Sequence, residues 1–372
     1  MLRVVVVEPF YSGSHRAWAD GLLRHSRHRI ELLTLPEGPW RQRMRRGAQE
    51  LAERARRLPP PDVLVVTDML DLAAFLALAR SWAQVPVLAY FHENQFTYPR
   101  LKGTKLNSWF GQINYLSALA ADAVAFNSDF HRRDFLGALQ ALARQPNNWL
   151  REEGIAAIAA KATVLPVGVE LGWLEDAADL RRDHWPRQVL WNHRWEFDKN
   201  PAMFARVLER LAAAGVPFHV AVAGERGLNP DRSLLQLPDR LGERVVHFGY
   251  ADRATYGRLL AESDIVMSTS RHEFFGVAMV EAMYAGCIPL APRRYNYPDL
   301  VPAAWHDTCL FGSEEECESK LASLLQHELP PRAPFRESAA RFRWESVIEA
   351  WDNAIEMLAR RSSAAAGTLV RP

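Results

Sequence analysis

Short apolar runs alternate with longer amphipathic stretches along most of the chain. The short runs are rich in valine, isoleucine and leucine, as is typical of strands buried on both faces of a parallel sheet. The longer stretches have the periodicity of helices that cover such a sheet. The runs that we interpret as strands begin at Arg3, Asp62, Val85 and Asp122 in the first half and at Gln188, Phe218, Arg244, Asp264 and Cys287 in the second. This pattern predicts an α/β fold with two Rossmann-like domains in tandem.

The domain boundary is expected where an apolar stretch gives way to a polar one near residue 172. A chain of 372 residues is longer than a single core usually grows, which also favours two domains. We therefore expect an N-terminal domain over 1–172, a C-terminal domain over 173–345, a final helix over 346–361 that packs back across the domains, and a disordered tail over 362–372.

Charge, cysteine content and apolar segments narrow the class of protein. Lysine and arginine number 45 against 44 acidic residues, so any contact with nucleic acid must use a local patch. The three cysteines suggest neither a disulfide framework nor a zinc site. We see no signal peptide, and no stretch approaches the roughly 18 apolar residues of a membrane span. We expect a cytoplasmic protein with no stable membrane association.

Polar residues that follow the apolar runs carry the candidate chemistry, because ligands bind at the carboxyl ends of the strands in open α/β sheets. After the first run, Gly13 can bring backbone close to a ligand, and Ser14 and His15 open a helix whose N-terminus attracts phosphate. The stretch is neither the dinucleotide fingerprint nor a Walker loop. An ordinary glycine turn with a serine cap is the alternative.

The stretch "FHENQFTYP" raises the question of what satisfies so many polar groups behind a buried strand. A ligand could satisfy His92, Glu93, Asn94 and Gln95, because such groups cost free energy unless a partner binds them. Alternatively, they tie down a loop through backbone hydrogen bonds, and Asn94 suits that structural role best.

In the second half, Arg194 and Lys199 lie five residues apart at a strand-to-helix junction. A guanidinium and an ammonium group there can converge on a diphosphate. The alternative is a solvated, charged turn.

The stretch "SRHEFFGVAMVEAMYAGCIPLAP" places two glutamates around a helix start. Glu273 precedes the helix, Phe275, Gly276 and Val277 offer its free N–H groups to phosphate, and Glu281 lies two turns in, where it can accept both ribose hydroxyls. An amphipathic helix with two solvated glutamates is the alternative.

These residues support a resemblance. The pattern E-x-F-G-V-x-x-x-E resembles the signature of retaining GT-B glycosyltransferases of the glycogen-synthase-like superfamily. The motifs "VEPFYSGSH", "YFHENQFTYP" and "LWNHRWEFDKNP" resemble the tRNA-queuosine α-mannosyltransferase family more narrowly. That resemblance implies a GT-B fold with two Rossmann-like domains facing a central cleft. It also implies transfer of mannose from GDP-mannose, with retention, to queuosine in the anticodon of tRNA of the tRNA-Asp type.

The resemblance also assigns roles. GDP-mannose is a co-substrate, no cofactor is implied, and no obligatory metal is expected. The residues expected to be catalytic are Glu273, His92, Arg194 and Lys199. Those expected to bind the donor are Gly13, Ser14, His15, Arg194, Lys199, Tyr250, Phe275, Gly276, Val277 and Glu281. Those expected to bind the acceptor are His92, Glu93, Asn94, Gln95 and Tyr98.

The expected tRNA footprint is the segment 41–57, which holds seven arginines against two glutamates. Tyr98, Arg100, Lys102 and Lys105 could extend it. A solvated helix face explains the same charges. Two other functions stay open: a GT-B enzyme acting on a lipid or polysaccharide, and a non-catalytic RNA-binding protein on this fold.

Overall fold

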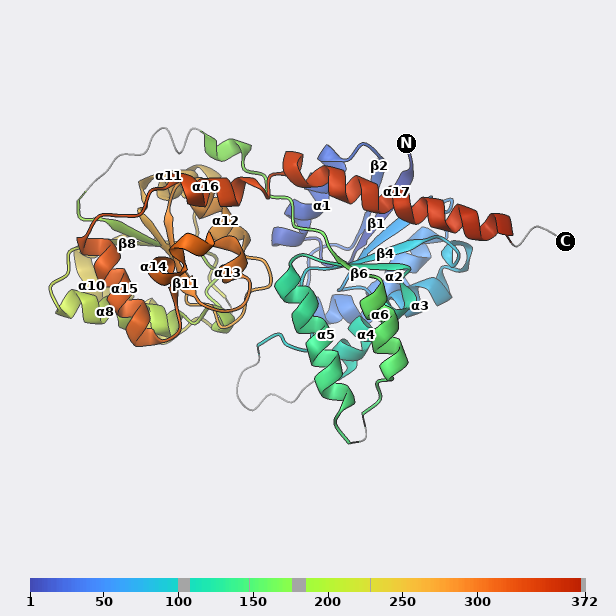
Figure 1. Cartoon of the computed structure of the whole chain (residues 1–372), viewed down its shortest axis with the longest axis horizontal. Coiled ribbons are helices and arrows are strands. Elements are labelled where there is room, and N and C mark those ends of the chain that lie inside the picture. Colours follow the sequence, from blue (N-terminus) through green and yellow to red (C-terminus); the bar gives the residue numbers. More distant parts are fainter. Residues whose placement is uncertain (100–107, 147, 176–184, 228, 369–372) are drawn as a thin grey trace. The chain divides into compact units, whose positions relative to one another are not determined.

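A computed structural model describes residues 1–99, 108–146, 148–175, 185–227 and 229–368. The described residues form two compact units (Figure 1). Of the described residues, those up to 98, those between 108 and 169 and those from 344 onward belong to unit 1, and residue 99 and those between 170 and 343 belong to unit 2. The predicted patch residues Arg100, Lys102 and Lys105 lie outside the described residues.

Unit 1 is built on a parallel sheet with the strand order β2-β1-β3-β4-β5-β6. Its strands are β1 (Arg3–Glu8), β2 (Arg29–Thr34), β3 (Val63–Thr67), β4 (Val87–Phe91), β5 (Ala123–Phe126) and β6 (Ala162–Val164). Its helices are α1 (Gly13–His25), α2 (Trp40–Ala55), α3 (Leu72–Leu78), α4 (Ser108–Ala120), α5 (Asp129–Ala143), α6 (Glu152–Ala160) and α17 (Trp344–Thr368). The inner strands β3 and β4 are buried at every position, which explains their continuous apolar runs.

The C-terminal helix α17 is part of unit 1, where it packs on α1, β3 and β4 (Figure 1). Trp344 lies directly against the backbone of Gly21 and Gly168, and a Cβ added at either glycine would come within 2.2 Å of its ring. The indole of Trp351 donates to the carbonyl of Pro166 at 3.0 Å. Tight packing against glycine and a partly buried hydrogen bond thus hold this helix to the rest of unit 1.

Unit 2 repeats the architecture with the strand order β12-β11-β10-β7-β8-β9. Its strands are β7 (Gln188–Trp191), β8 (His219–Ala223), β9 (Val245–Gly249), β10 (Ile265–Met267), β11 (Ile288–Pro292) and β12 (Leu310–Phe311). Its helices are α8 (Pro201–Ala213), α9 (Arg232–Leu235), α10 (Leu237–Leu241), α11 (Arg253–Glu262), α12 (Val277–Tyr284), α13 (Tyr297–Leu300), α14 (His306–Cys309), α15 (Glu314–Gln326) and α16 (Ala333–Ala340). The two Rossmann-like sheets predicted from the sequence are confirmed.

The domain boundaries need correction. The division falls between Val169 and Glu170 rather than after residue 172, and the last helix starts at Trp344 rather than at 346. The helix also continues to Thr368, through most of the tail expected to be disordered, because this stretch is rich in alanine, the best helix former.

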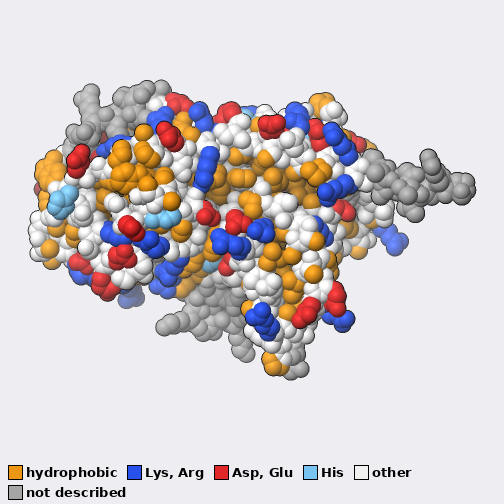
Figure 2. All heavy atoms as spheres, viewed as in Figure 1, with side chains coloured by type: hydrophobic (Ala, Val, Ile, Leu, Met, Phe, Trp, Pro, Cys, Tyr) orange, Lys and Arg blue, Asp and Glu red, His pale blue; other side chains and the backbone are white. Residues whose placement is uncertain are grey.

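Surface charge is mixed, in keeping with the balanced composition. Acidic and basic side chains are interspersed on the face seen in Figure 2. Within the described part of the chain, no helix is both long enough and apolar enough to span a bilayer.

Candidate active site

His92 follows β4 at the carboxyl edge of the unit 1 sheet, and its backbone is fixed from both sides. Its N–H donates to Oδ1 of Asp68 at 2.8 Å, and its carbonyl accepts from the side chain of Asn127 at 2.8 Å. Its ring meets the edges of Trp18 and Tyr90 at centroid distances of 4.7 Å. The sequence places a polar residue at the strand end, and these neighbours set the position of its ring.

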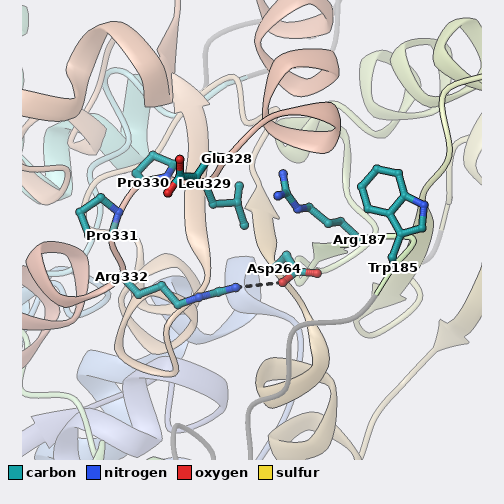
Figure 3. Close-up of a pocket in the computed structure, with 8 residues that line it drawn as sticks. All are labelled: Trp185, Arg187, Asp264, Glu328, Leu329, Pro330, Pro331 and Arg332. Atoms are coloured by element: carbon teal, nitrogen blue, oxygen red, sulfur yellow. Dashed lines mark hydrogen bonds and ion pairs between the residues drawn. The ribbon is translucent and has the colours of Figure 1, made fainter.

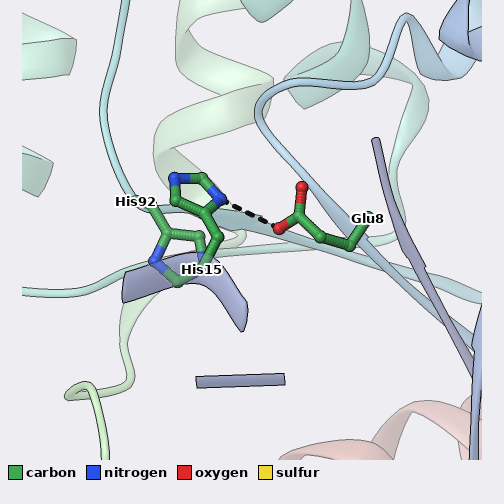
Figure 4. Close-up of side chains that lie close together, drawn as sticks. All are labelled: Glu8, His15 and His92. Carbon is green, nitrogen blue, oxygen red and sulfur yellow. Dashed lines mark hydrogen bonds and ion pairs between the residues drawn. The ribbon is translucent and has the colours of Figure 1, made fainter. Parts of the chain in front are cut away.

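A carboxylate–imidazole pair lies beside His92 (Figure 4). Oε2 of Glu8 is 2.9 Å from Nδ1 of His15, while Oε1 accepts the N–H of Phe10 at 2.7 Å. Glu8 is 0% exposed and His15 6%. Burial lowers the pKa of His15, but the charge and hydrogen bond of Glu8 outweigh it and raise that pKa to about 9. His15 is therefore an imidazolium at neutral pH.

His92 is held in the opposite protonation state. Its ring centroid lies 4.1 Å from that of His15, and burial together with the positive charge of His15 keeps its pKa well below the usual range. Nε2 of His92 and Oδ2 of Asp68 are both buried without a hydrogen-bond partner in the structure. Buried polar atoms of this kind are costly unless a ligand satisfies them.

The rest of the predicted acceptor loop divides into two groups. Asn94 is completely buried, and its carboxamide oxygen accepts the N–H groups of Phe96 and Thr97. Its assignment as an acceptor-binding residue is therefore corrected, because its side chain closes the loop on itself. Glu93, Gln95 and Tyr98 are partly exposed, and Gln95 donates to Glu93 at 2.9 Å.

The same cluster contains the residue types of a metal site. One ligand atom from each of Glu8, His15 and His92 lies within 4.8 Å of the other two. Both oxygens of Glu8 already accept hydrogen bonds, from His15 and the N–H of Phe10. The ion pair accounts for this arrangement by itself, so a reaction without an obligatory metal stays our prediction.

Lys199 is the centre of the candidate site in unit 2. Its ammonium lies 3.2 Å from a carboxylate oxygen of Asp198 and 3.2 Å from one of Glu273, and its side chain is only 14% exposed. The hydroxyl of Thr269 donates to the carbonyls of Lys199 and Asn200, which ties the loop after β7 to the loop after β10. Residues 74 positions apart in sequence thereby meet at the carboxyl edge of the sheet.

Arg194 lies in the same loop but in a different environment. Its guanidinium is 3.2 Å from Glu196, and its side chain is 55% exposed. Nearby, His193 is buried, and burial together with the charge of Lys199 lowers its pKa to about 3. The side chain of Lys199 is therefore largely buried between two carboxylates, whereas that of Arg194 is mostly exposed to solvent.

The N-terminus of α12 lies next to Glu273. Gly276 caps this helix with φ +103°, and a Cβ there would lie 3.0 Å from Leu300, so glycine is required. Phe275 is buried against Phe342 and can offer only its backbone, while Val277 is partly exposed. This geometry presents free N–H groups to an anion, as the motif predicts.

Glu281, on the second turn of α12, accepts a hydrogen bond from the hydroxyl of Tyr256 at 2.9 Å. Asn192 donates to the Tyr256 oxygen at 2.9 Å and to the carbonyl of Ala278 at 2.8 Å. Burial raises the pKa of Glu281 to about 7 even though the Tyr256 hydrogen bond opposes it. Glu281 is thus an oriented carboxylate that titrates near neutral pH.

Three other predicted donor residues have simple settings. Gly13 opens α1 with φ +52°, and Ser14 is exposed on its first turn. Tyr250 directly follows β9, so it lies at the carboxyl edge of the unit 2 sheet, and it is 75% exposed.

A surface pocket elsewhere in unit 2 is separate from these residues (Figure 3). It is lined by Trp185, Arg187, Asp264 and residues 328–332. Arg187 and Asp264 each precede a strand, which places the pocket at the amino edge of the sheet. Arg332 and Asp264 already form an ion pair at 3.0 Å, so the pocket is not the candidate active site.

The predicted tRNA footprint lies on α2, with one correction. Arg43 is only 5% exposed and packs over the ring of Phe10 at 4.8 Å, so it does not belong to a phosphate-binding surface. Arg41, Arg45 and Arg46 are exposed on the first two turns of the same helix.

Comparison with known proteins divides the chain in the same way as the fold. Residues 3–169 match the family described as tRNA-queuosine alpha-mannosyltransferase N-terminal, and residues 175–342 match glycosyl transferases group 1. The tRNA-queuosine alpha-mannosyltransferase of Drosophila melanogaster is 36% identical over 313 residues, covering 80% of this chain and 81% of that protein. The chain belongs to the tRNA-queuosine alpha-mannosyltransferase family.

More distant proteins share the architecture of this mannosyltransferase family. The GDP-mannose-dependent alpha-(1-6)-phosphatidylinositol dimannoside mannosyltransferase of Mycobacterium tuberculosis is 25% identical over 384 residues, covering 92% of this chain and 93% of that protein. Sucrose-phosphate synthase from Thermosynechococcus elongatus has a TM-score of 0.70 at 14% identity, covering 98% of this chain and 100% of that one. The expected GT-B fold is confirmed.

Several residues of this mannosyltransferase-family chain were not identified as site residues from the sequence. Glu8 stands in the motif "VEPFYSGSH", and a carboxylate seven residues before a histidine was the available signal. Asp68, Asn192 and Tyr256 act through partners that are distant in sequence, and no local motif identifies them.

Proposed function

We propose that the protein transfers mannose from GDP-mannose to queuosine in the anticodon of tRNA of the tRNA-Asp type, with retention at the anomeric carbon. The observation that carries this proposal is the match of residues 3–169 to the N-terminal part of the tRNA-queuosine alpha-mannosyltransferase family. The donor arrangement in unit 2, where Lys199, Glu273 and Glu281 surround the N-terminus of α12, supports it.

In this proposal, unit 2 binds the donor. Lys199, Arg194 and the N–H groups at Gly276 bind the diphosphate and stabilise the charge that develops as it leaves, a role valued at about 3 kcal/mol per donor elsewhere. Glu281, oriented by Tyr256, accepts the ribose hydroxyls. Glu273 contacts the transferred sugar. The name of the mycobacterial relative supports GDP-mannose as the donor.

Unit 1 supplies the acceptor residues. Neutral His92 hydrogen-bonds the reacting sugar or the acceptor hydroxyl through an atom that has no partner in the structure. Glu93, Gln95 and Tyr98 contact the acceptor, and His15 adds positive charge for the donor phosphate. The acceptor hydroxyl attacks the anomeric carbon on the face that the diphosphate leaves and gives its proton to the departing phosphate, and no cofactor or obligatory metal takes part.

The proposed function names tRNA as the macromolecular partner and the cytoplasm as the location of the protein. The tRNA binds through a local basic patch on α2, since the whole chain carries a net charge of only +1. We place the protein in the cytoplasm without stable membrane association. The three cysteines are buried and form no disulfide, as suits a reducing compartment.

Mass spectrometry of nucleosides tests this function directly. Queuosine-containing tRNA is incubated with the protein and, separately, GDP-mannose, GDP-glucose or UDP-glucose. We expect queuosine to gain one hexose with GDP-mannose alone, and tRNA without queuosine to stay unchanged. Transfer only from UDP-glucose would contradict the donor assignment. Transfer of mannose to liposomal phosphatidylinositol instead of tRNA would contradict the acceptor.

A further inference from the structure

An aromatic and cationic surface lies where α2 and α4 begin. We call Trp40, Arg41, Arg45, Trp109 and Phe110 the stacking platform. Trp109 is 39% exposed, and its ring centroid is 5.3 Å from that of Phe110. Arg45 lies over both rings, 5.6 Å from the centroid of Trp109 and 5.9 Å from that of Phe110.

The other half of the platform continues the same alternation of ring and cation. The ring of Trp40 lies 5.1 Å from that of Phe110, and the guanidinium of Arg41 lies 5.2 Å from the Trp40 ring. Phe110 is itself buried in a small cluster with Met44, Met69 and Ile113, and the partly buried Trp40 packs against this cluster. The partly exposed rings of Trp40 and Trp109 thus lie against the buried ring of Phe110.

The platform lies at the edge of the sheet that carries His92. In parallel α/β units each helix starts on the side where the preceding strand ends, so the first turns of α2 and α4 share that edge. Direct contacts agree with this placement. Arg43, on the first turn of α2, packs on Phe10, and the Phe10 ring meets His15 edge-on at 5.2 Å.

The charge of the platform suits a polyanion. Residues 40–47 include four arginines and no acidic residue, and three of the four are exposed. Proteins recognise unpaired bases by stacking them on aromatic rings and guanidinium planes, and they hold the backbone with arginine. A lipid surface would instead favour a longer apolar face with lysine and arginine on the other side.

We infer that Trp109 and Arg45 form a stacking surface for unpaired bases of the tRNA anticodon loop, with Arg41 and Arg46 contacting the flanking phosphates. This inference rests on the proposed function. It adds how the RNA is held beside the acceptor site, by stacking rather than by charge alone. Stacking on one aromatic ring is worth about 1–3 kcal/mol per base, which corresponds to roughly a 5- to 150-fold change in affinity.

Binding of a fluorescent anticodon stem-loop to the full chain tests the platform. We expect Trp109→Ala to weaken binding by roughly tenfold or more, with an intermediate loss for Trp109→Phe. Trp149→Ala is the matched control, because Trp149 is 38% exposed and packs on Tyr115. Arg45→Ala should cost more than Arg46→Ala, which removes the same charge from the same turn. Equal losses for the two arginine variants would overturn the stacking role.

Two further outcomes separate the platform from the proposed function. If wild-type protein transfers mannose to queuosine but Trp109→Ala binds the stem-loop normally, the platform is wrong and the function stands. If wild-type protein neither binds tRNA nor transfers mannose to it, both are wrong. Flotation of the wild type with anionic liposomes, lost in Trp109→Ala, would show a membrane surface and overturn the RNA assignment.

Discussion

The carboxylate of Glu8 and the imidazole of His15 form a buried ion pair, with 2.9 Å between Oε2 and Nδ1. Because Glu8 also accepts the N–H of Phe10, its position is fixed independently of the histidine. The pair holds a positive charge within ring contact of His92, which is itself neutral. Two histidines in contact thus have different protonation states at the same pH.

Replacing Glu8 by glutamine should shift the pH dependence of transfer. The pKa of His15 is about 9 with Glu8 present, and burial alone would lower it below the ordinary value of about 6.5. Because the proposed role of His15 requires its positive charge, wild-type transfer activity should stay constant up to pH 8 and decline through pH 9. The Glu8→Gln variant should decline at lower pH and be roughly thirtyfold less active at pH 8.

The folding stability of the protein should also depend on pH through the ion pair of Glu8 and His15. A raised histidine pKa in the folded state adds stability that is complete below about pH 6.5 and is lost as pH rises through about 9. The gap in Tm between wild type and Glu8→Gln should therefore narrow over that interval. Glu31→Gln, which affects a partly exposed pair with Arg3, is the control and should show no such narrowing. If Tm changed with pH in the same way for all three proteins, the raised pKa of His15 and its dependence on Glu8 would be refuted.

Donor affinity should fall in acid because of Glu281. Its pKa is raised to about 7, and only the carboxylate accepts both ribose hydroxyls, so the Kd for GDP-mannose should rise about tenfold per pH unit below 7. Tyr256→Phe removes a hydrogen bond that favours the charged form and should move the midpoint upward. Calorimetric titration with GDP-mannose at pH 5.5 to 8.5 measures both effects. A pH-independent Kd would exclude this role.

The two motif glutamates should give different kinetics. Glu281→Ala removes a ribose contact made before and during reaction, so it should chiefly raise the donor KM. Glu273→Ala should chiefly lower kcat, because Glu273 is assigned to the transferred sugar. Steady-state rates with varied GDP-mannose distinguish these cases. Near-normal kinetics in both variants would show that neither glutamate contacts the donor.

Chelation should leave transfer intact. With EDTA on the order of 1 mM, we expect unchanged rates of mannose transfer, because Lys199, Arg194 and a helix N-terminus are assigned to bind the diphosphate. The test assays transfer before and after EDTA, then after adding Mg²⁺, Mn²⁺ or Zn²⁺. Activity lost on chelation and restored by one ion would assign a metal to the cluster of Glu8, His15 and His92.

The sequence predicts the inner strands well but misses three of the four edge strands of the two described sheets. Buried strands such as β3 and β4 are continuous apolar runs, so they are visible without any tertiary information. The missed strands were β2, interrupted by Glu31, and the short strands β6 and β12. Their pairing depends on neighbours in the sheet, which a local pattern does not contain.

The site shows the same limit. Glu273, Gly276 and Glu281 lie on one local motif and were predictable, whereas Tyr256 is 25 residues from the carboxylate it orients. Arg43 could have been placed correctly, because it shares helical spacing with the buried positions Gly47 and Leu51. Its charge outweighed that periodicity in our prediction.

The position of Trp344 against Gly21 and Gly168 has a consequence for synthesis on the ribosome. Unit 1 contains the first strand of the chain, yet its packing is complete only when α17 has been made, after all of unit 2. Domains generally fold as units while the chain emerges, N-terminal ones first. Unit 1 therefore exposes the surface that α17 covers until all of unit 2 has been synthesised. Although its synthesis starts before that of unit 2, unit 1 completes its packing after it.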